Sequence, residues 1–441
     1  MQVRLSDHFT YKKLFRFTIP TVMMMILTSM YTIVDGFFVS NFVGKIPFAA
    51  VNLVMPLIMG IASFGFMIGT GGSAIVSASL GEGEEQRARE EFSMLIKFAI
   101  ILGISISAIC FMFMGSIVKF LGATGELINY SIIYGRISMV GLTFFILQNI
   151  FNSFFVVAEK GKLNLIISIV AGLTNVFLDY LFIAVFNLGI AGAAYATLVG
   201  QIVGGLFPLF YFSKKNTYLY FVKAKFKLGV LWRTFTNGSS ELMSFLSSSI
   251  VNILYNLQLM RIIGENGIAA YGVFMYISFV FAAIIIGYSI GSAPIVSYNL
   301  GAENYEELQN IFRKSLRLLA VSGIILTVLS RIFSGTLLEI FVGYDEELFE
   351  ISKSGFKIFS LYFIIFGFNI WGSAFFTALN DGLVSAVISF VRTLLFQATS
   401  VMILPLLFGL NGIWASASVA EVFALLVTII FFINKRKKYY Y

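Results

Sequence analysis

Twelve apolar runs, each long enough to cross a lipid bilayer as a helix, are the strongest constraint in this 441-residue sequence. A helix needs about 20 residues to span the hydrocarbon core, where its backbone must satisfy its own hydrogen bonds. Only 12% of the residues are charged, whereas soluble domains carry about 25%. We therefore predict an all-α polytopic membrane protein with twelve transmembrane helices, at residues 15–40, 49–79, 94–118, 129–156, 163–186, 190–212, 233–258, 268–298, 315–337, 355–378, 383–407 and 412–433.

Lysine and arginine residues are distributed unevenly between the two sides that these spans define. An even number of spans puts both termini on one side, and 22 of the 30 basic residues fall there, in the tails and the even-numbered loops. Basic residues accumulate in cytoplasmic loops, so we predict cytoplasmic termini and a location in a bacterial plasma (inner) membrane. The net charge of +8 then reflects topology, and we expect no nucleic-acid partner.

The second half of the chain repeats the first at an offset of 220 residues. The match is gapless over six spans, and matched pairs include Gly71 and Gly291, Gly81 and Gly301, and Gly189 and Gly409. Single coincidences of small residues carry little weight, but one unbroken offset across six spans indicates an internal repeat.

Each half contains six spans, so both halves share one orientation and should be related by a pseudo-two-fold axis along the membrane normal. We predict an N-terminal six-helix lobe at 1–212, a cytoplasmic basic linker at 213–232 and a C-terminal six-helix lobe at 233–441. Parallel repeats around a midplane cavity are a transporter architecture. We expect an apolar and aromatic cavity lining with few charges.

Two aspartates lie within spans of the first half, Asp35 in span 1 and Asp179 in span 5. Asn175 precedes Asp179 by four residues and shares its helix face, while Thr197 and Tyr134 lie at a similar depth. Ionisable residues are costly in lipid and usually functional. The oxygens of this aspartate, asparagine and threonine set suit a hard cation such as Na⁺, or a proton shared by carboxylates. A structural role, in which the acids only hold helices together, is the alternative.

The offset pairs Asp35 with Tyr255 and Asp179 with Thr399, so the second half has no carboxylates at these positions. Packing requirements that were symmetric would not select acids in one lobe only. We therefore predict that cation coupling is confined to the N-terminal lobe.

The second half has its own acids in spans 7 and 12, Glu241 and Glu421. Glu241 either attracts a cationic substrate or is a solvated charge near the cytoplasmic rim, and a role for Glu421 is equally open. Tyr31, Gln148, Tyr134 and Glu241 are our candidates for residues that adjoin the cation site or contact substrate.

Several classes of function are excluded by what the sequence lacks. Cys110 and His8 are the only residues of their kinds, which rules out His/Cys metal clusters and an internal His-based triad. The motifs G-x-x-x-x-G-K-[ST], H-E-x-x-H and C-x-x-C are absent, so we expect no enzyme activity, no cofactor, and energy from an ion gradient or a separate subunit. The G-T-G-G sequence at 69–72 lies mid-span and indicates close helix packing or a hinge. An aspartyl hydrolase built on Asp35 and Asp179 is the enzymatic alternative.

In combination, these features resemble the multidrug and toxic compound extrusion (MATE) family, closest to its MepA-like bacterial branch. The likeness covers essentially the whole chain. The residues that carry it are Pro20, V-D-G-F-F-V at 34–39, L-G-E-G-E at 80–84, N-V-F-L-D at 175–179 and G-A-A-Y-A-T at 192–197.

The resemblance implies a V-shaped pair of six-helix lobes that exports lipophilic, often cationic small molecules in exchange for H⁺ or Na⁺. It implies Pro20 as a hinge in span 1, Tyr134 beside the site, and a cation site formed by Asp35, Asn175, Asp179 and Thr197. Some branches also use acids in spans 7 and 10, but span 10 here has Asn369. The resemblance therefore implies no cation site in the C-terminal lobe. We expect a monomer whose partners are the transported molecule, the coupling ion and the bilayer.

A flippase for a lipid-linked substrate of the same superfamily is the alternative function. Such proteins usually have more spans and more intramembrane arginine. Arg136 and Arg392 fall within spans here and keep this alternative open.

Overall fold

The computed structural model describes residues 3–215, 217–343 and 345–441, apart from a few side chains within 32–45 and 340–341. Phe37 of the V-D-G-F-F-V motif is among the side chains outside this description. The described chain is helical and contains no strand. The first half contains α1 (Tyr11–Phe38), η1 (Val39–Val43), α2 (Lys45–Gly81), α3 (Glu85–Phe120), α4 (Glu126–Val157), α5 (Gly161–Asp179), η2 (Tyr180–Val185) and α6 (Gly189–Ser213). The second half contains α7 (Leu228–Ile263), α8 (Glu265–Gly301), α9 (Tyr305–Ile332), α10 (Ser334–Val342), α11 (Glu346–Phe359), η3 (Ser360–Ile364), α12 (Phe366–Ala378), α13 (Gly382–Phe390), η4 (Val391–Phe396) and α14 (Gln397–Tyr439).

Eleven helical stretches of the described chain are long and apolar enough to cross a membrane. The last stretch, Gly382–Tyr439, contains a kink at Gly409, where φ is 56° and ψ is −136°. Gly189, its partner in the repeat, has a φ of 58° and starts α6 after η2. Because glycine adopts positive φ without strain, both positions turn the chain between two helices. The last stretch therefore holds two spans, which gives the predicted twelve.

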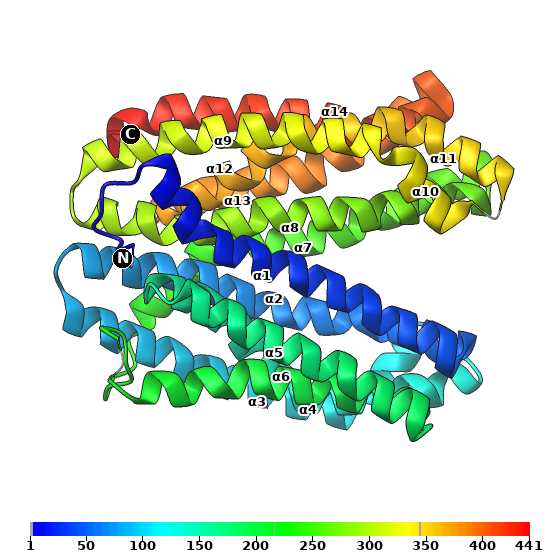
Figure 1. Cartoon of the computed structure of the whole chain (residues 1–441), viewed down its shortest axis with the longest axis horizontal. Helices are drawn as coiled ribbons and strands as arrows, with labels where there is room; N and C mark the ends of the chain where they lie inside the picture. Colours follow the sequence, from blue (N-terminus) through cyan, green and yellow to red (C-terminus); the bar gives the residue numbers. More distant parts are fainter. Residues whose placement is uncertain (1–2, 216, 344) are drawn as a thin grey trace.

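The two halves form two helical lobes, each with its own hydrophobic core. Figure 1 shows the lobes side by side, with both termini at the same end of the molecule. Phe151 and Phe154 are fully buried in the N-terminal lobe, and Phe274 and Trp414 in the C-terminal lobe. The predicted arrangement of two six-helix lobes is confirmed.

The helix boundaries reproduce the 220-residue offset. α2 runs from 45 to 81 and α8 from 265 to 301, and α3 and α9 begin at 85 and 305. Both α3 and α9 start about ten residues before the predicted spans, because their polar first turns extend beyond the apolar run. The match slips by one residue within spans 4 and 10: α4 and α11 begin at 126 and 346, whereas α4 and α12 end at 157 and 378, and α5 and α13 begin at 161 and 382. The pairing of Asp179 with Thr399 lies in this slipped region, whereas the pairing of Asp35 with Tyr255 does not.

Two close helix contacts at glycines, which we call the glycine seams, join the lobes: α2 meets α7 at Gly71, and α8 meets α1 at Gly291. The repeat relates these two contacts to each other. A Cβ atom at Gly71 of α2 would overlap the carbonyl oxygen of Thr234 in α7, and one at Gly291 of α8 would lie 3.1 Å from Thr18 Cα in α1. Gly71 and Gly291 are partners at the 220-residue offset. Close packing, rather than phosphate binding, is thus the role of the G-T-G-G sequence, as predicted.

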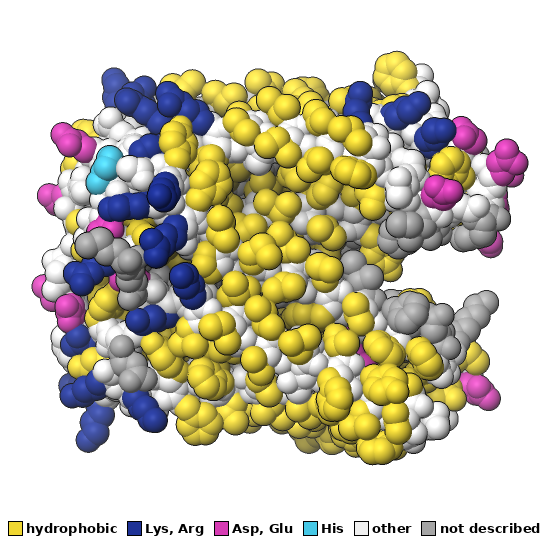
Figure 2. Space-filling view, in the orientation of Figure 1, with side chains coloured by type: hydrophobic (Ala, Val, Ile, Leu, Met, Phe, Trp, Pro, Cys, Tyr) yellow, Lys and Arg dark blue, Asp and Glu magenta, His cyan; other side chains and the backbone are white. Residues whose placement is uncertain are grey.

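One end of the molecule, which we call the basic end, carries both termini and the connections at 82–84, 158–160 and 214–227. Figure 2 shows lysine and arginine side chains gathered there, next to a broad apolar belt. At the opposite end a notch separates the two lobes (Figure 2). The molecule is therefore V-shaped and closed at its basic end.

Residues 217–227 lead into α7 and run along the N-terminal lobe. Phe221 stacks on Phe92, with 5.2 Å between ring centroids, and the Val222 N–H donates to Ser93 Oγ at 2.9 Å. α7 already begins at Leu228, so the predicted linker at 213–232 ends inside the first turns of that helix.

Candidate cation site

Asp35 and Asp179 face each other inside the N-terminal lobe. Asp35 lies in α1 and Asp179 ends α5, and their exposed fractions are 7% and 0%. The two carboxyl groups are within hydrogen-bonding reach of one another. No donor from the described chain reaches Oδ1 of Asp35 or either carboxyl oxygen of Asp179. Buried carboxylates require a positive charge or a proton, and these side chains alone supply neither.

Regular helix geometry ends close to both aspartates. The π-helical segment η2 begins directly after Asp179, and η1 begins at Val39, one turn after Asp35. π-helical turns are rare, and they occur often at functional sites. The two acids therefore lie at the start of irregular outer parts of α1 and α5.

Four further predicted residues lie around the aspartates. Asn175 Nδ2 donates to Thr197 Oγ1 at 3.5 Å and links α5 to α6. Tyr134 of α4 is 2% exposed and lies close enough to both carboxyl groups for direct electrostatic interaction. Tyr31 places its ring against Gly172 where α1 packs on α5. Four helices thus bring the predicted set together, and its role in coupling stays a prediction.

Pro20 and Gln148 lie apart from this cluster. Pro20 is buried inside the continuous helix α1 and packs against Gly161 at the start of α5. Gln148 packs on Gly204, where α4 meets α6. It is about 20 Å along α4 from Tyr134, so the structure does not place Gln148 next to the cation site.

Glu241 lies on the face of α7 that contacts α2 of the other lobe. Gly238, one turn before it, packs on the Met67 backbone, and Phe245, one turn after it, lies 3.5 Å from a Cβ atom built at Gly60. Glu241 is half-buried, and no hydrogen bond or ion pair joins it to another described residue. It is therefore an acid at the contact between the lobes rather than a solvated charge outside them.

The C-terminal lobe contains a buried ion pair that we did not predict from the sequence. Arg392 in η4 donates to Glu421 Oε1 of α14 from Nε at 2.8 Å, and its Nη2 lies 2.7 Å from the same oxygen. Asn369 of α12 donates from Nδ2 to Glu421 Oε2 at 2.6 Å. An intramembrane arginine needs an acidic partner, and this requirement was the signal available in the sequence.

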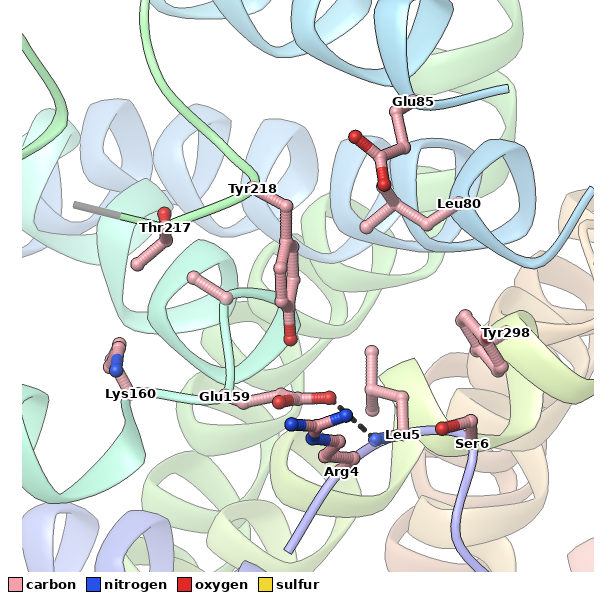
Figure 3. Close-up of a pocket in the computed structure, with 11 residues that line it drawn as sticks. Arg4, Leu5, Ser6, Leu80, Glu85, Glu159, Lys160, Thr217, Tyr218 and Tyr298 are labelled. Carbon is pink, nitrogen blue, oxygen red and sulfur yellow. Dashed lines mark hydrogen bonds between the residues drawn. The ribbon is translucent and has the colours of Figure 1, made fainter. Parts of the chain in front are cut away.

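The N-terminal segment, residues 3–10, contributes Arg4, Leu5 and Ser6 to the lining of a cavity of about 480 Å³ at the basic end (Figure 3). Arg4 and Leu5 face Glu159 and Tyr218 of the other elements, and the Leu5 N–H donates to Glu159 Oε1 at 2.6 Å. Burial and the neighbouring Glu159 carboxylate raise the pKa of Tyr218. The cavity is polar and lies at the end of the molecule, so it is not the apolar midplane cavity that we predicted. The notch at the opposite end does lie between the two lobes, where we predicted a cavity (Figure 2).

The N-terminal segment is also bound to the C-terminal lobe. Phe9 is fully buried, and its N–H donates to Glu307 Oε1 at 2.9 Å. Asn310 Nδ2 donates to the Phe9 carbonyl at 3.0 Å. Together with the Leu5–Glu159 hydrogen bond, these contacts tie both lobes together at the basic end.

Two parallel six-helix lobes that are closed at one end and separated by a notch at the other define a membrane protein with a transporter fold. The MatE family model matches the chain twice, at residues 20–181 and 242–403, once in each lobe. The chain belongs to the MatE family.

Relatives and solved structures agree with this assignment. The multidrug export protein MepA of Staphylococcus haemolyticus (strain JCSC1435) is 24% identical over 414 residues, which cover 93% of this chain and 90% of that protein. The probable multidrug resistance protein YoeA of Bacillus subtilis (strain 168) is 26% identical, over 76% of this chain and 74% of its own length. The crystal structure of MATE in complex with MaL6 has the same fold, with a TM-score of 0.91 at 23% identity over 98% of this chain and 97% of that one.

Proposed function

We propose that this protein is a secondary active multidrug efflux transporter. It exports lipophilic, cationic small molecules in antiport with H⁺ or Na⁺, and its basic end faces the cytoplasm of a bacterium. The observation that carries the proposal is the buried pair of Asp35 and Asp179, which has no donor from the described chain at three of its four carboxyl oxygens.

The chemistry of this pair supports cation exchange. Two carboxylates at close range cannot both stay charged without a bound cation or a shared proton. Na⁺ takes oxygen ligands, and Asn175 and Thr197 add an amide and a hydroxyl oxygen next to the acids. Proton and metal-ion loading are therefore alternatives at one site, and either neutralises it.

The two glycine seams and the notch support transport by alternating access, in which the lobes open at one end of the molecule while they are closed at the other. The glycine seams close the basic end, while the lobes are apart at the opposite end. Loading changes the charge where α1 meets α5, and α1 also contributes Thr18 to one seam. A ligand drives a conformational change only as far as it binds one state better than the other. We propose that α1, with Pro20 between Thr18 and Asp35, links the site to the seam.

A cationic cargo is supported by an acid at the lobe contact, and multidrug export is supported by the names of the relatives. Glu241 supplies a half-buried negative charge on the face where the lobes meet, and an acid in an otherwise apolar cavity favours cations. The relatives MepA and YoeA are named as multidrug export and probable multidrug resistance proteins.

The flippase alternative is less well supported, because both intramembrane arginines have other contacts. The Arg136 guanidinium is exposed and lies 5.5 Å from the Phe111 ring centroid. Arg392 is paired with Glu421. Arg392 is therefore not left as an anion-binding group for a lipid-linked phosphate.

The test is ethidium transport by the full-length protein in proteoliposomes, with a pH gradient and a Na⁺ gradient imposed separately. At least one gradient should drive ethidium transport by the wild type. Asp35→Asn and Asp179→Asn should each reduce transport to the background of protein-free liposomes, whereas Tyr255→Phe, at the position matched to Asp35, should retain it. Transport that neither gradient drives, or that survives both aspartate substitutions, would contradict the proposal.

A further inference from the structure

The C-terminal lobe contains a polar cluster on the spans that correspond, through the repeat, to the spans of the N-terminal cation site. Spans 1, 4, 5 and 6 contribute Asp35, Tyr134, Asp179 and Thr197. Their repeat counterparts, spans 7, 10, 11 and 12, contribute Tyr255, Asn369, Arg392 and Glu421. The two clusters differ in charge, because the first holds two acids and no base, and the second holds one acid and one base.

Both carboxylate oxygens of Glu421 and the amide oxygen of Asn369 accept hydrogen bonds, whereas the buried hydroxyl of Tyr255 has no partner in the described chain. Arg392 presents two nitrogens to Glu421 Oε1, and Asn369 Nδ2 donates to Oε2. Thr428 in turn donates to Asn369 Oδ1 at 2.9 Å, which fixes the orientation of the amide. The side chain of Glu421 is 8% exposed and that of Arg392 is 21% exposed. This pair is a preorganised charge complex rather than a surface contact.

The complex lies deep in the membrane-spanning region. Glu421 is about 18 Å along its helix from the turn at Gly409, and Asn369 is about 14 Å from the end of α12. At that depth an unpaired carboxylate would require a cation. A guanidinium stays protonated throughout the accessible pH range, so Arg392 supplies the positive charge permanently.

We infer that Arg392 is the resident counter-ion of a second carboxylate site and thereby prevents the C-terminal lobe from taking up a coupling cation. This inference rests on the proposed function, because it explains why cation exchange would be confined to one lobe. Removing the guanidinium exposes Glu421 as a site for H⁺ or Na⁺. Arg392 is thus a residue that sets how many cations the protein can load.

Few other groups around Glu421 can take over this role. Arg392 is its basic neighbour, and the phenols of Tyr255 in α7 and Tyr362 in η3 lie within electrostatic range. A neutral phenol donates one hydrogen bond but brings no positive charge. Asn369 and Thr428 do not titrate. Within the described chain, no second base forms an ion pair with Glu421.

The test measures protonated carboxyl groups by infrared difference spectroscopy on the purified full-length protein in Na⁺-free buffer, between about pH 5 and about pH 8. Arg392→Met should add a carboxylic-acid band equal to one group per molecule. The band should disappear in Arg392→Met/Glu421→Gln and should weaken when Na⁺ is added. Wild type and Arg392→Lys, which keeps the charge, should lack it.

Two results would overturn the inference. One is a folded Arg392→Met protein without the additional band. The other is a carboxylic-acid band that is present in the wild-type spectrum and absent from that of Glu421→Gln, because Glu421 would then be protonated beside Arg392. This second comparison decides the question even if Arg392→Met does not fold. The spectra need no transport, so a failure of the proposed function in proteoliposomes remains distinguishable from a failure of this inference.

Discussion

The two lobes share their packing but differ in how they treat buried charge. Each lobe contributes one glycine of the paired seams, Gly71 in α2 and Gly291 in α8, and these two positions are related by the repeat. Within the described residues, the N-terminal lobe buries two facing aspartates that have no basic partner. The C-terminal lobe buries a glutamate that is paired with Arg392. A duplicated fold can therefore keep its packing contacts symmetric while only one copy pairs its buried acid with a base.

The largest expected difference between the lobes is in stability. Glu421→Gln leaves the Arg392 guanidinium without its partner, and breaking a buried pair costs about 3–5 kcal/mol. Asp179→Asn removes an acid that has no partner base, so it should change stability by less than about 1 kcal/mol or increase it. Thermal unfolding of the detergent-purified variants in Na⁺-free buffer measures both effects. Equal destabilisation by the two substitutions would remove the asymmetry between the lobes.

The seams should respond symmetrically, in contrast to the charged sites. Gly71→Leu and Gly291→Leu each force a side chain into a close contact, and overpacking costs about 1–3 kcal/mol. The population with a closed basic end should then fall by about five- to a hundred-fold, and ethidium transport should fall with it. Gly272→Leu in α8 is the matched control, because no atom lies within 4 Å of its Cβ position. A strong loss for only one seam would show that the lobes do not close as a symmetric pair.

The most local effect is expected at the N-terminal segment. Phe9→Ala removes a fully buried ring, and because burying a phenylalanine side chain is worth about 1.5–3 kcal/mol, the substitution should favour opening of the basic end by at least about ten-fold. Hydrogen exchange of the backbone amides at residues 3–10 should increase accordingly. Phe15→Ala, at an exposed position near the start of α1, is the matched control and should leave exchange unchanged. Unchanged exchange in Phe9→Ala would mean that the segment does not hold the lobes together.

Much of this fold could be predicted because lipid imposes simple rules on a sequence. Spanning length and the 220-residue offset predicted the twelve helices and the two lobes, and the depth of Asp35 and Asp179 predicted that they would meet. The one-residue slip within spans 4 and 10 could not be predicted from a gapless match. Helix irregularities such as η3 and η4 add or absorb a residue without a clear compositional signal.

The C-terminal ion pair could have been predicted in part. Arg392 required an acidic partner within the membrane, and the second half contains only two acids within spans, Glu241 and Glu421. Choosing between them required knowing that spans 10, 11 and 12 meet at one depth. The N-terminal segment gave no such signal, because its contacts with Glu159 and Glu307 are mostly made by its backbone.

The most direct test of the central claim is cation release from purified protein when ethidium binds. Proton release is followed in weakly buffered Na⁺-free detergent solution, and displacement of radioactive Na⁺ in a parallel sample. We predict that the wild type and Arg392→Met/Glu421→Gln, which is neutral at both positions, release the same number of cations, whereas Asp35→Asn and Asp179→Asn release none. Release that persists in both aspartate variants, or that is lost in the folded double variant of the C-terminal lobe, would contradict a coupling site confined to the N-terminal lobe.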